Sequence, residues 1–504
     1  MIGLLCRGAA VLLALTLGAC DLGPDYVRPE VEMPVAFRAT EGTAAEAWPS
    51  EDWWRGFHSP ELTDLIEQAR VQNFDIVAAI ARVRQADAQV RIAGAPLLPN
   101  VAATGSASWE QVGATRGGFT GVSRGNSTTG TIDIHNYAFS PVNIAYEVDF
   151  WGKNRAARQS AMASAVFSRF DQEVVALTTV TNVANTWFSA LAFADRLDVA
   201  QRNLADAERT LAVIRGRLDA GTASALDLAQ QESLVAGERA NIPALRNQME
   251  QELIGLGILV GRPPEAINVR PGSLTTLALP PVAPGLPSSL LQRRPDVAET
   301  EAQLVAANFN IKVARAAFFP SVQLTGQYGF ANAALNTLFS PGGTIVSIAA
   351  GFTQPLFDGG TLRGQLEQAK GRYDELLANY RKAVVQAFTD VEDGLTAWRF
   401  TTEQEVLQRQ AVATAQRAAN IARAQMEAGT VDVTTVLQAE TTLFNAEDLL
   451  VQVRLARFQA LLSLYKALGG GWVAPEGPII DQFPGLKPGL VPGGFALPVG
   501  GNVR

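Results

Sequence analysis

The sequence has 504 residues and a mass of 53.7 kDa, with 41 basic and 49 acidic residues and a net charge of −8. This length allows about three domains, and the acidic balance without a basic run argues against a nucleic-acid-binding surface. Two histidines and two cysteines leave almost nothing for a zinc, haem or iron–sulfur site. The composition therefore predicts neither a resident metal or cofactor nor an enzyme.

The first twenty residues predict export from the cytoplasm. Arg7 precedes an apolar run over residues 9–19, which has the length of a signal-peptide core and is too short to span a membrane. The run ends in Leu17-Gly18-Ala19-Cys20, which resembles a bacterial lipobox. We expect residues 1–19 to be removed and Cys20 to be acylated. The alternative is an ordinary secretory signal that happens to end in a cysteine.

Two very long helices are predicted from the placement of proline and glycine. Prolines are absent from 142–242 and from 356–474, and within these windows the helical pattern covers about 153–219 and about 361–427. At 1.5 Å per residue each helix would be roughly 100 Å long, far above the average of globular helices. Apolar residues follow a 3-4 spacing, typical of helices packed side by side at shallow angles: Val174, Leu177, Thr181, Ala184, Phe188 and Leu191. Further helical runs follow at about 224–260 and 432–468.

The chain contains an internal repeat. Gly221-Thr222 matches Gly429-Thr430 at an offset of 208 residues, and Phe150-x-Gly152 matches Phe357-x-Gly359 at 207. We therefore expect a first repeat over 61–260 and a second over 290–469. The linker at 261–289 holds seven prolines, and the two flanks, residues 20–60 and 470–504, are rich in proline and glycine.

Each repeat carries two candidate strands, at about 99–111 and 136–150 in the first and about 320–330 and 344–357 in the second. They alternate apolar and polar residues over about the 9–11 residues that a membrane-spanning strand needs. Any one of them also fits a half-buried strand of a soluble sheet. Four strands in lipid would leave their edges unsatisfied, and bacterial barrels begin at about eight strands. Several copies must therefore share one barrel, and three copies would supply twelve strands.

Several motifs resemble those of the TolC/NodT family of outer-membrane efflux factors, in particular the lipoprotein branch that serves RND pumps. The matching blocks are Gly23-Pro24-Asp25-Tyr26-x-Arg28-Pro29, Ala145-Tyr146-Glu147-Val148-Asp149-Phe150-Trp151-Gly152, Arg293-Arg294-Pro295-Asp296, Phe318-Phe319-Pro320 and Gln354-Pro355-Leu356-Phe357-Asp358-Gly359-Gly360. The resemblance implies a mainly α-helical fold with a β membrane part. It also implies a homotrimer with a twelve-stranded barrel in outer-membrane lipid and a twelve-helix periplasmic α-barrel. The Pro-rich linker and the termini would form an equatorial domain.

The same resemblance places the functional residues at the two helical turns. In the family these turns dock a periplasmic adaptor protein, so Gly221, Thr222, Gly429 and Thr430 are the expected contacts. The alternative is that each glycine only caps its helix. Asp227 and Asp432 are candidates for a ring that narrows the pore, although the family's gate aspartates of the second repeat fall on Thr435 and Gln438 here.

Other charged residues have plainer interpretations. The acidic residues near the turns, which include Glu232 and Glu440, also fit solvated helix faces. Pro295 and Asp296 favour helix initiation, which suggests a structural role for the Arg293-Arg294-Pro295-Asp296 block.

The function predicted from these features is a passive exit duct of a tripartite efflux system in the outer membrane of a Gram-negative bacterium. A periplasmic adaptor and an inner-membrane RND pump would be its partners. Two alternatives stay open: the duct of a type I protein-secretion system and a structural lipoprotein that transports nothing. The sequence does not identify the exported substrate.

Overall fold

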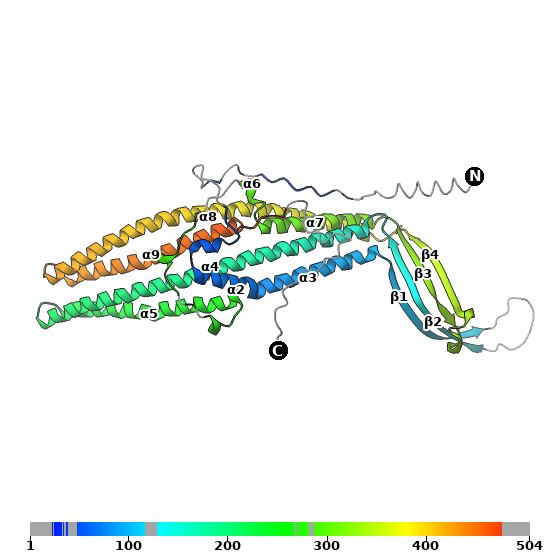
Figure 1. The fold of residues 1–504 in the computed structure, drawn as a ribbon, viewed down its shortest axis with the longest axis horizontal. Coiled ribbons are helices and arrows are strands. Elements are labelled where there is room, and N and C mark those ends of the chain that lie inside the picture. Colours follow the sequence, from blue (N-terminus) through cyan, green and yellow to red (C-terminus); the bar gives the residue numbers. More distant parts are fainter. Residues whose placement is uncertain are drawn as a thin grey trace, which may run out of the picture.

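The protein is a long rod of helices with a bent β-sheet at one end, as the computed structural model shows in Figure 1. The structure describes residues 23, 25–32, 34, 37–38, 48–115, 129–267, 269, 271–281 and 287–475. The predicted signal peptide, Cys20 and the end of the predicted tail lie outside these residues. Within the described part of the chain, no helix has both the length and the apolar character needed to cross a membrane.

Two helical hairpins form the part of the rod that points away from the sheet. The first consists of α4 (Lys153–Asp219) and α5 (Ala225–Val260), and the second of α8 (Thr361–Glu427) and α9 (Val433–Ala467). The two long helices have the bounds expected from the sequence, since Gly152 and Gly360 adopt the left-handed conformation before the first turn of each. Both hairpins end at the same extremity of the molecule (Figure 1).

Three shorter helices complete the rod toward the sheet: α2 (Pro60–Gln72), α3 (Phe74–Gly94) and α7 (Pro295–Ala316). A single turn, α6 (Pro287–Leu290), precedes α7. Pro295 is the first residue of α7, and Asp296 lies in its first turn. The side chain of Arg294 is 9% exposed, and its guanidinium contacts Asp296 at 2.6 Å and Asp390 at 2.8 Å. Arg294 therefore ties α7 to α8.

The sheet joins the two repeats. It contains β1 (Asn100–Thr115), β2 (Thr129–Val148), β3 (Ser321–Asn332) and β4 (Thr344–Thr353), all antiparallel in the order β1-β2-β3-β4. The central pair is β2 from the first repeat and β3 from the second. The strand bounds differ from the predicted ones, most clearly in the first hairpin, where β1 continues to Thr115 and β2 already begins at Thr129. Cross-strand pairing that continues to Thr115 and Thr129 extends this hairpin beyond the strand ends predicted at 111 and 136.

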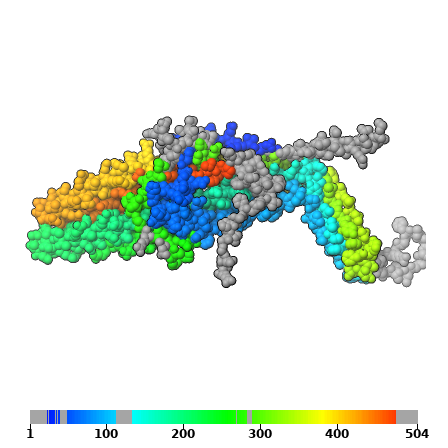
Figure 2. All heavy atoms as spheres, viewed as in Figure 1, coloured from blue at the N-terminus to red at the C-terminus, as the bar shows by residue number. Residues whose placement is uncertain are grey.

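The middle of the rod holds the largest apolar core. Residues of the short helix η2 (Trp53–Phe57) insert between the hairpins, where Trp53 stacks on Tyr465 with 5.0 Å between ring centroids and Phe57 lies 5.0 Å from Phe188. Figure 2 shows that the rod is thicker at this level, where residues near the N-terminus (blue) and the proline-rich linker (green) cover the helices. These aromatic contacts hold η2 on α4 and α9.

Candidate functional site

The turn between α4 and α5 is a helix C-terminal cap. Gly221 has a φ of +74°, and its N–H donates to the Leu218 carbonyl at 2.9 Å, while the Thr222 N–H donates to the Arg217 carbonyl at 2.7 Å. The Thr222 hydroxyl donates to the same carbonyl at 3.0 Å. This pair of bonds satisfies the last carbonyls of the helix, as in the Schellman motif.

The turn between α8 and α9 repeats the same geometry. Gly429 has a φ of +75°, its N–H donates to the Met426 carbonyl at 2.9 Å, and the Thr430 N–H donates to the Gln425 carbonyl at 2.9 Å. The Thr430 hydroxyl also donates to Gln425, at 3.0 Å. A Cβ placed on either turn glycine would meet no atom within 4 Å. Both turns therefore present open, exposed surfaces, and their glycines serve the backbone conformation.

The two candidate gate aspartates begin the helices that follow these turns. The Asp227 carboxylate accepts the Ser224 N–H at 2.8 Å, and the Ser224 hydroxyl accepts the Asp227 N–H at 3.1 Å, which forms a capping box. Asp432 accepts both the hydroxyl and the N–H of Thr435, at 2.6 and 2.9 Å. These two bonds from Thr435 lower the pKa of the exposed Asp432 carboxyl. Each carboxylate therefore has a capping role of its own.

One side chain connects the two turns within a single copy of the chain. The Arg217 guanidinium, near the end of α4, donates to the Met426 carbonyl near the end of α8. A cation is favoured at the C-terminal end of a helix because of the helix dipole. The turns are therefore held side by side by a direct bond.

A buried group of polar residues, here called the polar layer, lies a few helical turns away from this end. It consists of Asp206, Thr210, Gln231, Arg423 and Glu440, which come from all four helices of the two hairpins. Glu440 is fully buried and accepts hydrogen bonds from Arg423 Nε at 2.8 Å and from the Thr210 hydroxyl at 2.6 Å. Arg423 also contacts Asp206 at 3.3 Å, and Gln231 Nε2 lies 3.5 Å from Glu440. The layer connects the two hairpins inside the wall of the rod.

A solvated helix face was one of the two interpretations of Glu440 from the sequence, and its complete burial rules that interpretation out. Glu440 lies in the 3-4-3 apolar stripe formed by Val433, Val436 and Leu443, all of which are buried, but the first repeat has the same spacing around Glu232, so the stripe alone does not predict burial. By contrast, its repeat equivalent Glu232 is 46% exposed and pairs with Arg215 at the surface.

The sheet exposes both its edges and much of its apolar surface. The order of strands leaves β1 and β4 at the edges, each with one row of backbone groups facing no other strand of the described chain. Apolar side chains on β4 are strongly exposed, including Val346 at 70%, Ile348 at 90% and Phe352 at 69%. A single copy of the chain therefore leaves the sheet incomplete as a membrane structure.

The chain matches the outer membrane efflux protein family over residues 65–262 and 286–470. It is 39% identical over 459 residues to the pyoverdine export outer membrane protein OpmQ of Pseudomonas aeruginosa, covering 91% of this chain and 95% of the relative. It is 34% identical to the probable efflux pump outer membrane protein TtgC of Pseudomonas putida, covering 93% and 96% of the two chains.

This protein belongs to the outer membrane efflux protein family. The solved structure of the outer-membrane channel OprN superposes with a TM-score of 0.82 at 26% identity, over 90% of this chain and all of that one. The chain is accordingly an outer-membrane efflux channel protein of a Gram-negative bacterium, with a mainly helical fold and a β part, as the motifs had indicated. The relatives named above are channel and pump components rather than enzymes.

Proposed function

We propose that three copies of this chain form one continuous tube, with twelve strands closed in outer-membrane lipid and the helical rods side by side in the periplasm. The supporting observation is the open four-stranded sheet with exposed apolar side chains. Closing the sheet into a barrel pairs the backbone groups at its edges, each of which would cost several kcal/mol if left unpaired in lipid. A closed barrel requires about eight strands or more. Three antiparallel sheets joined edge to edge, β4 of one copy beside β1 of the next, meet both conditions.

The tube serves as the passive exit duct of a tripartite RND-type efflux system. The two turns at the far end dock the periplasmic adaptor through Gly221, Thr222, Gly429 and Thr430, and the adaptor connects the duct to the inner-membrane RND pump. The exposure of both turns and their identical geometry support this assignment. Asp227 and Asp432 are proposed to line the narrow end of the pore while they cap their helices. Cys20, once acylated, anchors each copy to outer-membrane lipid.

The exported compounds are small molecules. The relatives that support this are named for the export of pyoverdine and for an efflux pump. A susceptibility panel of dyes, detergents, antibiotics and metal salts on a deletion strain tests the assignment. We expect hypersensitivity that the complementing gene reverses. An unchanged panel together with altered secreted proteins would contradict it and favour a protein-secretion duct.

The docking assignment is tested by the double variant Gly221→Trp/Gly429→Trp. Large side chains on both turns should abolish efflux while heat-resistant trimers persist in detergent, because no atom of the described residues lies within 4 Å of either Cβ. Gly272→Trp is the matched control, since Gly272 also has open space around it but lies in the linker. Normal efflux in the double variant would refute the docking role.

A further inference from the structure

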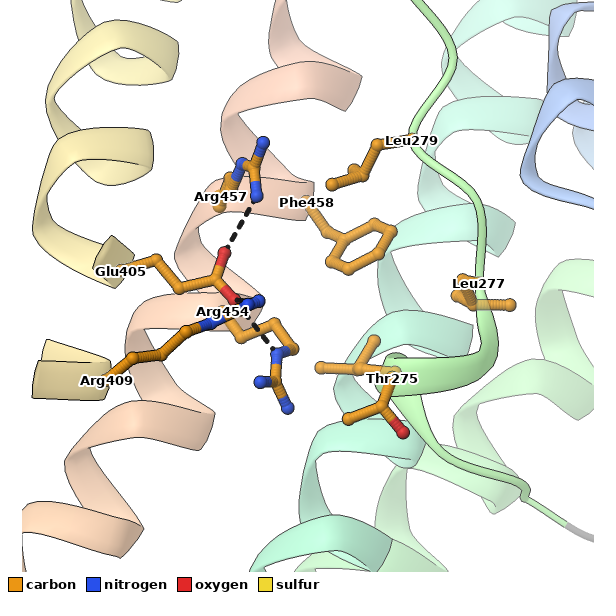
Figure 3. A pocket seen from close by; sticks show the side chains of 9 residues that line it. Thr275, Leu277, Leu279, Glu405, Arg409, Arg454, Arg457 and Phe458 are labelled. Atoms are coloured by element: carbon orange, nitrogen blue, oxygen red, sulfur yellow. Dashed lines mark hydrogen bonds and ion pairs between the residues drawn. The ribbon is translucent and has the colours of Figure 1, made fainter. Parts of the chain in front are cut away.

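A cavity of about 420 Å³ lies between the proline-rich linker and the hairpin of α8 and α9. Figure 3 shows its two unlike walls. One wall is apolar and consists of Leu277 and Leu279 from the linker with Phe458 from α9. The other wall consists of charged side chains from α8 and α9. This volume falls in the range of small-molecule sites in proteins.

The charged wall is built around one carboxylate. Glu405 on α8 is 3% exposed and accepts from Arg409 at 2.6 Å, Arg457 at 2.9 Å and Arg454 at 3.1 Å. Burial raises the pKa of the Glu405 carboxyl, but the hydrogen bonds from these three guanidiniums hold it below its ordinary value. Because a guanidinium stays charged under all ordinary conditions, the group carries two positive charges more than Glu405 neutralises.

One further carboxylate, Asp195, lies within the electrostatic influence of Arg454. Asp195 on α4 accepts the backbone N–H of Leu274 at 3.0 Å, and burial raises its pKa although hydrogen bonds from Ser273 and Leu274 and the charge of Arg454 oppose this. Even with Asp195 ionised, an excess of positive charge faces the cavity.

The guanidiniums also retain unused donors. Arg457 Nε is buried and has no hydrogen-bond partner among the described residues. The same guanidinium lies over the ring of Trp398, 4.8 Å from its centroid, which fixes its plane. Arg454 is 14% exposed and donates to Glu405 through Nε alone. Because solvent does not reach Arg457 Nε, the donors that an anion in the cavity can meet are the terminal nitrogens of Arg454, which make no bond to Glu405.

We propose that this cavity binds a small organic anion, specifically a carboxylate with a short apolar tail. The carboxylate lies against Arg454 and Arg457, since paired N–H donors match its two oxygens. The tail lies against Leu277, Leu279 and Phe458. The bound anion bridges the linker to the second hairpin. The proposal does not depend on the duct or on the docking turns proposed above, so its failure would leave the proposed function intact.

The test is calorimetric titration of the full-length protein in detergent micelles with hexanoate, acetate and inorganic phosphate, at matched chloride concentration. We expect hexanoate to bind at least about tenfold more tightly than acetate, because each buried methylene adds about fourfold to affinity and burial of two of its four additional methylenes is enough for that difference. Phosphate tests whether charge alone suffices. Equal binding of acetate and hexanoate, or phosphate binding above hexanoate, would overturn the proposed ligand class. No saturable binding by any probe would overturn the site.

Two variants separate a ligand site from a structural ion cluster. Arg454→Gln should weaken hexanoate binding at least tenfold. Glu405→Gln keeps the side-chain size and releases the three guanidiniums, so it should strengthen binding several-fold. A purely structural cluster predicts that both substitutions lower thermal stability and neither improves binding. Leu277→Ser, in the linker, should reduce the preference for hexanoate over acetate without changing acetate binding, and its failure to do so would overturn the apolar half of the proposal.

Discussion

Replacing Glu440 by alanine tests whether the polar layer holds the two hairpins together. The side chain is fully buried, and its loss would leave the Arg423 guanidinium inside the wall with one remaining carboxylate, Asp206, at 3.3 Å. The Thr210 hydroxyl would also lose its acceptor, whereas Gln231 Nε2 would keep its 2.9 Å bond to the Ala207 carbonyl. Glu232→Ala is the matched control, because Glu232 is the repeat equivalent and is half exposed.

The expected sizes of the two effects differ clearly. Removing one partner of a buried ion pair costs about 3–5 kcal/mol. Because Arg423 keeps its contact with Asp206, we expect Glu440→Ala to lower the free energy of unfolding by about 3 kcal/mol, the lower end of this range. An exposed pair such as Glu232 with Arg215 contributes about 0–1 kcal/mol. The double variant Glu440→Leu/Arg423→Met should recover most of the loss, because an apolar pair needs no desolvation of charge.

The assay is guanidinium chloride unfolding of the purified protein, followed by circular dichroism, with an efflux measurement in cells in parallel. We expect the unfolding midpoint to fall for Glu440→Ala, to stay near wild type for Glu232→Ala and to recover in the double variant. Equal losses for both single alanine variants would refute the argument that burial in the polar layer decides the cost.

Three further outcomes are expected. Gly429→Ala and Gly221→Ala should each lower the free energy of unfolding by about 1 kcal/mol in thermal unfolding. The φ values near +75° strain an L residue, but there is space for the added Cβ. A loss above about 3 kcal/mol would contradict this reasoning. Burial, together with the charges of Asp171 and Asp296, raises the pKa of Glu299 to about 7. The contribution of the Glu299 carboxyl to the free energy of unfolding should therefore be complete below its ordinary pKa of 4.5 and lost as the pH rises through about 7. Glu299→Gln should flatten this dependence in unfolding curves, and an unchanged slope would contradict the assignment. Arg294→Lys should cost about 2 kcal/mol, because an ammonium cannot replace the paired bonds to Asp296; a melting temperature equal to wild type would disprove this.

The long helices and the repeat were predictable because they depend on local signals. A proline-free window, a glycine before the first turn and a glycine after the last one determine where α4 and α8 begin and end. The two turns between the helices of each hairpin follow from the same signals, because Gly221 and Gly429 end equivalent helices. The ends of the strands were less predictable, because β1 and β2 extend as far as each finds a pairing partner in the other.

By itself the sequence determined the helix periods, the turn positions and the exported, two-repeat character of the chain. Only the tertiary structure decided which polar residues are buried. Glu440 and Glu232 occupy equivalent positions, yet one faces the opposite hairpin and the other faces solvent. Likewise, Arg409 and Arg457 are 48 residues apart in the sequence and meet at Glu405 only because α8 and α9 run antiparallel. The physical reason is that periodicity acts within one helix, whereas burial and charge pairing depend on the neighbouring helix that each face meets.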